Sequence, residues 1–371
     1  MAAIPKKIAL IGYKLSNGGA ERVLSETSFI LENAGYEVHV IIMIDEVTYP
    51  YAGKLLNLGV LRSKKNGTVN KFNRYKTLRN YIVLEKFDAL IDFRFRVNIL
   101  QELLIYKLYK GIKIQTVNSG KYENYLFENK WLSERIFSQF DKIVCISKKQ
   151  LEKIEQERHF QNLVIIPNPI DITKISLLQE QEIVVDFPYV LAVGRLFPEK
   201  QFDQLVKAYA KSVLPQKGIR LLIIGQGYEK SKIQKAIDDS AVSQMVHLLG
   251  FQHNPYPYYK HAYFLVQSSL YEGLPMVLLE ALATGTPVVA FDCFSGPSEI
   301  IRHQQNGWLV EDQNFEALTE AMNTMYQDTD LYQLCKANAI KSISRFSPEN
   351  VGEKWVSLLS ELFDKNKKSR P

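Results

Sequence analysis

Short runs of Val, Ile, Leu and Phe recur along this 371-residue chain and alternate with longer segments of helical period. Runs that are apolar at nearly every position are typical of strands buried on both faces of a parallel sheet. Between two such runs, Phe202, Leu205, Val206 and Tyr209 recur at i, i+3, i+4 and i+7, as on the buried face of a helix. The alternation predicts an α/β fold, with doubly wound parallel sheets and helices on both faces.

The alternation occurs twice, with a polar break near 168–186 that begins with the turn signal Asn168-Pro169-Ile170-Asp171. We therefore expect two Rossmann-like domains, 1–175 and 176–345, followed by a C-terminal segment, 346–371. The predicted strands are 8–13, 38–43, 88–93, 113–118, 142–147, 163–167, 188–194, 220–225, 246–250, 263–268, 287–292 and 307–310.

The tail from Phe346 has the signals of a helix start, with Ser347 as a cap, Pro348 at the first helical position and Glu349 in the first turn. We predict a helix over 346–363 and fraying of 364–371. Its expected buried stripe is Val351, Trp355, Leu358, Leu359 and Leu362.

Composition narrows the class of protein. An apolar content of 46% and a charged content of 23% are ordinary for a soluble globular protein. No apolar run approaches the roughly 18–20 residues that span a bilayer. Three widely spaced cysteines argue against a disulfide framework or a zinc site and favour buried thiols in a reducing, cytoplasmic setting.

We expect neither a metal site nor a cofactor. The six histidines show no ligand spacing, and Asp328-Thr329-Asp330 lies between two helical patterns, where a turn and a helix cap are expected.

Positive charge is concentrated in the first 180 residues, which hold 27 Lys and Arg against 19 Asp and Glu. A solvated basic loop and helix would explain the densest part, 61–82, and so would docking on an anionic membrane surface. We find no nucleic-acid-binding module and predict no nucleic-acid partner. The bases of this region are Arg62, Lys64, Lys65, Lys71, Arg74, Lys76 and Arg79.

The most specific pattern runs from Glu272 to Val289. Glu272 ends a strand, Gly273 and Leu274 turn the chain, Pro275 is expected at the first helical position, and Glu280 follows inside the helix. A helix N-terminus offers unpaired N–H groups and a positive dipole end, which suit a phosphate. A carboxylate in the helix can bind the vicinal diol of a ribose, while one in the loop can reach the other end of the ligand.

Two cations follow another strand at the same predicted edge. Arg195 presents a planar fork that matches two phosphate oxygens, and Lys200 lies five residues later, at the start of the Phe202 helix. Gly225 ends the next strand. Ligands of open α/β sheets bind at this edge, so the pattern predicts a sugar-nucleotide pocket.

A weaker signal follows the first strand, where Gly18 and Gly19 open a helix. Glycines let a backbone approach a ligand closely, although a plain tight turn explains them equally well.

On these motifs the chain resembles the family 4 retaining glycosyltransferases, which have the GT-B fold. The resemblance extends over nearly the full length and includes Gly-Gly-Ala-Glu-Arg at 18–22, the hinge at 167–171, Gly-Arg-x4-Lys at 194–200 and the E-x7-E motif at 272–280. It implies two domains facing a central cleft, an acceptor-side domain first and a donor domain second, with the last helix crossing back to the first domain.

The resemblance also implies residue roles. Arg195 and Lys200 would hold the diphosphate of the donor, Glu280 its ribose, and Glu272 the transferred sugar. Many members have a His after the strand that ends here at Val117, whereas this chain has Asn118, which can hydrogen-bond to a sugar but cannot carry a proton at neutral pH.

The activity implied is transfer of a hexose or N-acetylhexosamine from a UDP-sugar to a hydroxyl, with retention and without a metal. A lipid-linked glycan at the inner face of the plasma membrane is the expected acceptor, for surface-polysaccharide synthesis. A soluble acceptor, a non-catalytic scaffold that binds nucleotide sugars, and an epimerase on the same fold remain open.

Overall fold

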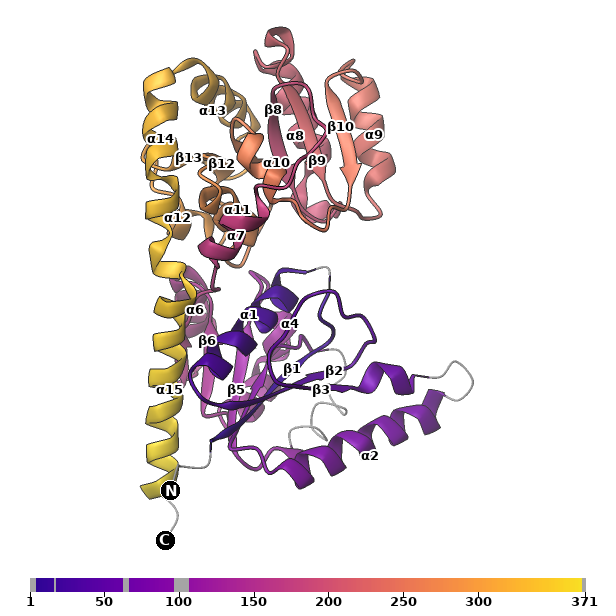
Figure 1. Ribbon diagram of the computed structural model, residues 1–371, viewed down its shortest axis with the longest axis vertical. Coiled ribbons are helices and arrows are strands. Elements are labelled where there is room, and N and C mark those ends of the chain that lie inside the picture. Colours follow the sequence, from indigo (N-terminus) through magenta and orange to yellow (C-terminus); the bar gives the residue numbers. More distant parts are fainter. Residues whose placement is uncertain (1–4, 17, 63–66, 97–106, 369–371) are drawn as a thin grey trace. The chain divides into compact units, whose positions relative to one another are not determined.

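The computed structural model describes residues 5–16, 18–62, 67–96 and 107–368 (Figure 1). The chain divides into two compact units. Unit 1 comprises Met1–Pro169 and Pro348–Pro371, and unit 2 comprises Ile170–Ser347. Each unit contains one sheet in which all the strand pairs are parallel.

The sheet of unit 1 has the order β3-β2-β1-β4-β5-β6-β7. The chain winds from β1 to one side through β2 and β3, then returns to the other side of β1 with β4, so the strand order reverses between β1 and β4. The strands are β1 (Lys7–Gly12), β2 (Glu37–Ile42), β3 (Lys54–Asn57), β4 (Ala89–Asp92), β5 (Ile112–Val117), β6 (Lys142–Cys145) and β7 (Leu163–Ile165).

Helices connect these strands, and a long one closes the unit. They are α1 (Gly19–Asn33), α2 (Gly67–Glu85), α4 (Glu123–Leu126), α5 (Lys130–Phe137), α6 (Lys148–Glu157) and the C-terminal α15 (Pro348–Lys368), with a 3-10 turn at Leu58–Leu61.

The sheet of unit 2 has the order β10-β9-β8-β11-β12-β13 and reverses between β8 and β11. Val190 and Leu191 are both fully buried, as expected for a strand covered on both faces. The strands are β8 (Tyr189–Val193), β9 (Arg220–Ile224), β10 (Val246–Gly250), β11 (Leu265–Gln267), β12 (Val288–Phe291) and β13 (Gly307–Val310).

On one face of this sheet, α8, α9 and α13 share a single apolar core with the strands. The helices of unit 2 are α7 (Ile172–Leu178), α8 (Phe202–Lys211), α9 (Lys230–Asp239), α10 (Tyr256–His261), α11 (Met276–Ala283), α12 (Pro297–Ile300), α13 (Phe315–Gln327) and α14 (Thr329–Ser342), with 3-10 turns at Pro198–Lys200, Pro215–Lys217 and Ser344–Phe346.

All twelve predicted strands are present, most of them one or two residues shorter at an end. Strand β3 was not predicted; it is a four-residue edge strand that begins with an exposed lysine and has no fully buried residue. Edge strands need less apolar surface than central ones, so the apolar pattern that reveals the other strands is absent there. Asp328 is the N-cap of α14 as expected, accepting from the Leu331 amide at 2.9 Å.

The C-terminal helix belongs to unit 1, where it packs on α1. It begins at Pro348, and its five predicted stripe residues are all buried. Gly352 allows a close approach, since a Cβ there would lie 3.1 Å from Cγ2 of Ile30 in α1. The prediction of fraying from residue 364 was wrong, because α15 continues to Lys368, while 369–371 lie outside the described residues.

A buried ionic group lies where β4 ends. Arg94 donates to both carboxylate oxygens of Asp92, at 3.0 and 2.7 Å, and Arg96 donates to one of them at 3.1 Å. Burial would raise the pKa of Asp92, but the two guanidinium charges and the hydrogen bonds from Arg94 outweigh it and lower that pKa to about 2. The carboxylate therefore keeps its charge inside the protein.

We predict that Asp92→Asn lowers the free energy of unfolding by about 3 kcal/mol or more, because it removes a buried charge from its ionic partners. Urea unfolding at pH 7 measures this. The control is Glu361→Gln, which breaks the exposed ion pair with Lys365 and should change the free energy of unfolding little. Because the folded-state pKa lies below the roughly 3.9 of an unfolded aspartate, the contribution is present above about pH 4 and is lost as the pH falls toward 2. Equal stabilities for D92N and E361Q would contradict the prediction.

Candidate functional site

Several predicted site residues of unit 2 lie in loops at one edge of its sheet. Strands β8 and β11 are parallel neighbours at the point where the strand order reverses, so the loops that follow them leave from the same edge. Arg195 follows β8, Gly225 follows β9 and Glu272 follows β11. In open α/β sheets, ligands bind outside the carboxyl ends of the strands at such a switch point.

Glycines bring the loops after β8 and β9 into backbone contact. Gly225 has φ +148°, and a Cβ there would lie 1.8 Å from the carbonyl oxygen of Gly194. A Cβ on Gly227 would lie 2.3 Å from the carbonyl oxygen of Leu196. The Leu196 amide donates to the Gln226 carbonyl at 2.9 Å. Gly225 and Gly227 therefore shape this edge by their lack of a side chain.

Lys200 and Glu272 form an ion pair between the loops after β8 and β11, through Nζ and Oε1. The two side chains are 15% and 11% exposed. Hydrogen bonds join the same loops nearby, since the Leu270 amide donates to the Glu199 carbonyl at 2.8 Å and the Ser268 hydroxyl to the Lys200 carbonyl at 2.9 Å. Lys200 ends the 3-10 turn Pro198–Lys200 and thus lies two residues before the first residue of α8, at the start of this helix as predicted.

Arg195 is the more accessible cation, with 60% of its side chain exposed. Its guanidinium pairs with Glu199 at 3.0 Å and lies 4.7 Å from the ring centroid of Phe197. Glu199 was not predicted as a site residue, although its position four residues after Arg195 was a usable signal. Both predicted phosphate-binding cations therefore have a carboxylate partner of their own.

Glu280 lies inside α11, as predicted, and is 5% exposed. The Tyr259 hydroxyl donates to its Oε2 at 2.9 Å. Helix α11 begins at Met276, so Pro275 is its N-cap and not its first residue as predicted. Gly285, at φ +79°, follows the last turn of α11.

The turn between Glu272 and α11 is packed against the loop after β12. Leu274 is buried, and the Ser295 hydroxyl donates to the Gly273 carbonyl at 3.2 Å. The Glu272 amide donates to the Phe294 carbonyl at 2.9 Å. Glu272 is thereby fixed through its main chain as well as its side chain.

The other predicted site residues belong to unit 1. Gly18 precedes α1, which begins at Gly19, and Asn118 follows β5, where its amide donates to the Thr116 hydroxyl at 2.7 Å. Both positions are at the carboxyl ends of strands, near the switch point of the unit 1 sheet.

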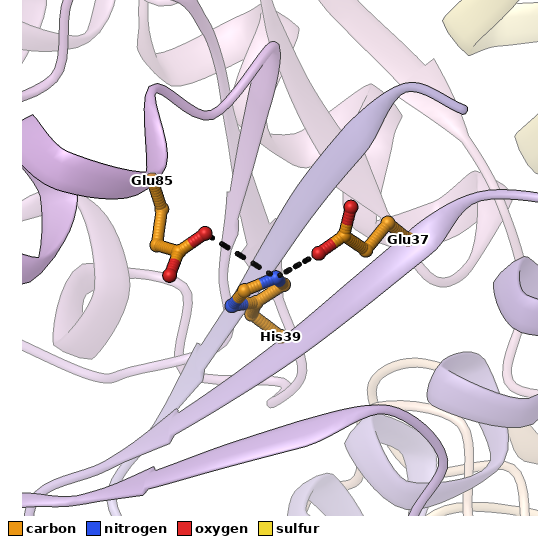
Figure 2. A group of neighbouring side chains, drawn as sticks. All are labelled: Glu37, His39 and Glu85. Carbon is orange, nitrogen blue, oxygen red and sulfur yellow. Dashed lines mark hydrogen bonds and ion pairs between the residues drawn. The ribbon is translucent and has the colours of Figure 1, made fainter. Parts of the chain in front are cut away.

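A second titratable cluster, not predicted from the sequence, lies near the amino ends of the unit 1 strands (Figure 2). His39 is buried, and its Nε2 lies 3.1 Å from Oε1 of Glu37 and 4.0 Å from Oε2 of Glu85. Its Nδ1 lies 2.6 Å from the Tyr81 hydroxyl oxygen. Glu37 and His39 are two residues apart on β2 and so share a face, which was a usable signal.

This cluster has the residue types of a metal site but lacks the charge for one. Lys7 pairs with Glu85 at 2.7 Å and Lys54 with Glu37 at 2.8 Å, so two ammonium groups balance two carboxylates. The hydrogen bonds from Lys54 and His39 lower the pKa of Glu37 to about 2. We assign the cluster to holding the strand ends of unit 1 together.

All three cysteines are buried free thiols, as predicted. Burial raises the pKa of Cys145 to about 12 and that of Cys335 to about 11, so neither is a thiolate at neutral pH. Among the helices of the described residues, none combines the length and apolar character needed to cross a bilayer.

Two family models match the chain, one in each half. Residues 17–174 match the model described as Glycosyltransferase Family 4, and residues 174–342 match Glycosyl transferases group 1. A similar protein from Campylobacter jejuni, 28% identical over 90% of this chain and 94% of its own, is named N-acetylgalactosamine-N,N'-diacetylbacillosaminyl-diphospho-undecaprenol 4-alpha-N-acetylgalactosaminyltransferase. The amylovoran biosynthesis glycosyltransferase AmsD of Erwinia amylovora is 26% identical over 96% of this chain and 99% of its own.

Solved structures share the fold at low sequence identity. Anabaena Alr3699/HepE, crystallised with UDP and glucose, superposes with a TM-score of 0.77 at 18% identity, over 96% of this chain and all of its own. TarM of Staphylococcus aureus, in a complex that includes UDP, has a TM-score of 0.76 at 16% identity, over 95% and 99%. These matches confirm the predicted GT-B fold.

The two models together account for residues 17–342 and therefore for the main part of both units. The Arg195, Lys200, Glu272 and Glu280 motifs lie within the second match. Arg195, Lys200 and Glu272 follow β8 and β11 at one sheet edge, and Glu280 lies inside α11. This chain belongs to glycosyltransferase family 4 and is a retaining enzyme that transfers a sugar from a nucleotide-sugar donor.

Proposed function

We propose that the enzyme transfers a hexose or N-acetylhexosamine from a UDP-sugar to a hydroxyl of a lipid-linked glycan in surface-polysaccharide synthesis. The observation that supports this most directly is that Arg195, Lys200 and Glu272 follow β8 and β11 at the switch point of unit 2, where the Lys200–Glu272 ion pair joins the two loops. Two solved structures of similar fold contain UDP, which supports UDP as the nucleotide.

In this proposal the edge of unit 2 binds the donor from one end to the other. Arg195 and Lys200 contact the diphosphate, together with the main chain at Gly225 and at Gly273, Leu274 and Pro275. Glu280 accepts from the ribose hydroxyls, using its position inside α11. Glu272, held beside Lys200, contacts the transferred sugar.

In the proposal, the anomeric configuration is retained because the acceptor attacks the same face of the sugar from which the diphosphate departs. The acceptor hydroxyl forms the new bond to the anomeric carbon while the bond to the diphosphate oxygen breaks, and that phosphate takes the acceptor proton. The protein stabilises the negative charge that develops on the diphosphate through Arg195 and Lys200. In unit 1, Gly18 and Gly19 are proposed to contact the donor, and Asn118 the sugar and acceptor side.

We predict that Arg195→Ala lowers turnover about 100-fold, because it removes a charged donor from the leaving group. The measurement is UDP release from UDP-glucose, UDP-galactose, UDP-N-acetylglucosamine and UDP-N-acetylgalactosamine by the wild type, then by R195A on the accepted donor. Near-normal turnover of R195A would remove the residue from the mechanism. Binding of UDP without release from any of the four donors would instead favour a nucleotide-sugar-binding scaffold.

The pairing of Arg195 with Glu199 leads to a prediction of opposite sign. Glu199→Gln removes a negative charge that lies 3.0 Å from the guanidinium and near the proposed diphosphate. We expect UDP to bind about threefold more tightly, with a difference that shrinks in 1 M salt. Calorimetric titration with UDP measures this, and Glu320→Gln on α13 is the matched control. Unchanged or weaker binding by E199Q would show that Glu199 mainly orients Arg195.

The proposed membrane contact uses the outer face of α2. Residues at the spacing i, i+3, i+7, i+10, i+14 lie on one face of a helix. At that spacing, the exposed residues of α2 are Val69, Phe72, Lys76, Arg79 and Val83. Phe72 is 65% exposed, and no carboxylate of the described residues pairs with Lys76 or Arg79.

Apolar and basic side chains on one exposed face suit a surface of anionic lipid. The diphospho-undecaprenol in the name of the Campylobacter relative supports a lipid-linked acceptor here, and hence peripheral attachment to the inner face of the plasma membrane. Lys64 and Lys65, which belong to the same predicted basic region, lie outside the described residues.

We predict that the wild type co-sediments with vesicles containing 30% phosphatidylglycerol at low salt and dissociates at 0.5 M NaCl, because exposed charges are screened. Lys76→Gln with Arg79→Gln should weaken binding about tenfold or more, at roughly 1 kcal/mol per base. Lys217→Gln with Lys235→Gln in unit 2 removes the same charge and should leave binding unchanged. Equal effects of the two pairs would indicate attraction by net charge, without a role for α2.

A further inference from the structure

One oxygen of the Glu272 carboxylate carries all of its side-chain contacts. Oε1 accepts from the Lys200 ammonium, from the Gln267 amide at 3.0 Å and from the Ser269 hydroxyl at 2.6 Å. Among the described residues, none donates to Oε2. Because three donors exceed the two lone pairs of a carboxylate oxygen, Oε1 has no capacity for a ligand.

The two neutral donors are placed by the end of β11. Gln267 is its last residue and Ser269 lies two residues later, so the two side chains project to the same side of the chain. Both side chains are buried, at 6% and 1% exposure. Their contacts with Glu272 therefore persist without competition from bulk water.

The orientation of the Gln267 amide is determined by its neighbour. Its NH2 group must face the carboxylate, because the opposite orientation would bring two oxygens together. The Gln267 carbonyl oxygen is then buried without a partner in the described part of the chain. An unsatisfied buried oxygen opposes this arrangement, so the contact with Glu272 must outweigh that cost.

Lys200 connects this cluster with the proposed diphosphate contact. An ammonium has three N–H donors, and Glu272 takes one of them. The remaining donors can bind phosphate oxygen while the ion pair stays intact. A single lysine thus sets the spacing between the phosphate contact and the sugar contact.

We propose that Gln267 and Ser269 are positioning residues, which together with Lys200 hold Oε1 of Glu272 so that only Oε2 accepts a hydroxyl of the transferred sugar. This inference rests on the proposed function for the identity of the ligand. It adds two residues to the site and assigns distinct roles to the two oxygens of one carboxylate.

Ser269→Ala and Gln267→Met test this inference, with Ser133→Ala, a buried serine of α5 in unit 1, as the control. Kd for UDP is measured by calorimetry, and kcat and KM for UDP release are measured on the donor that the wild type accepts. We expect UDP affinity within about twofold of wild type, because UDP lacks the sugar, and kcat lowered about tenfold. Ser269→Thr, which keeps the hydroxyl, should recover kcat to within about threefold of wild type.

Wild-type kcat and KM in both S269A and Q267M would overturn the inference, as would equal loss of UDP affinity and turnover, which would mean that the phosphate contact itself had collapsed. Thermal unfolding identifies a variant that fails to fold. In that case S269T tests the inference, because a loss of kcat in S269T with intact UDP affinity would also overturn it.

If the wild type releases UDP from none of the four donors, the proposed function fails, and binding alone decides the inference. The affinity of UDP-glucose relative to UDP is then compared between the wild type and S269A. If the wild type binds UDP-glucose more tightly than UDP and S269A abolishes this difference, the positioning role is supported. If the wild type binds UDP-glucose no more tightly than UDP, or if S269A keeps the difference in affinity, the inference is overturned.

Discussion

The ion pair between Lys200 and Glu272 joins loops that are 72 residues apart in sequence. Its geometry depends on the parallel sheet, because β8 and β11 are neighbours only where the strand order reverses. The loops leave the same edge, and main-chain hydrogen bonds from Leu270 and Glu272 join the loop after β11 to the loops after β8 and β12. The relative position of the proposed phosphate and sugar contacts is therefore fixed by the strand order and the main chain of the loops, and not by the two side chains alone.

The charges at this edge nearly cancel before any donor binds. Arg195 pairs with Glu199 and Lys200 pairs with Glu272, so the two cations proposed to bind the diphosphate each have a carboxylate beside them. Because the charges nearly cancel, net charge alone would bind a diphosphate weakly at this edge. Main-chain amides near Gly225 and Gly273 add hydrogen-bond donors that, unlike the two cations, carry no charge for a carboxylate to offset. This balance suits an enzyme that must stabilise a departing diphosphate and then release it, since excess positive charge would slow the dissociation of the product.

The apolar runs predicted every strand with two buried faces, because burial on both sides leaves a pattern that needs no knowledge of neighbours. The same reasoning failed for β3, whose edge position requires little apolar surface. Motif spacing predicted Glu272 and Glu280 in loop and helix, but it could not predict Gln267, Ser269 or Glu199 as partners. Those contacts depend on which oxygen faces which donor across neighbouring loops, and spacing along the chain does not encode that. The Glu37–His39 pair was recoverable from the two-residue period of β2, whereas its lysine partners come from other strands.

The contacts of the two glutamates bear on the proposed mechanism. A carboxylate that attacked the anomeric carbon would need a lone pair of high electron density. Three donors on Oε1 withdraw density from Glu272, and Tyr259 does the same for Glu280, so both groups are better suited to accept hydrogen bonds than to form covalent bonds. Asn118 cannot take a proton in place of a histidine. These contacts support the proposal that the oxygen of the donor's own phosphate takes the acceptor proton, with attack on the face from which the diphosphate departs.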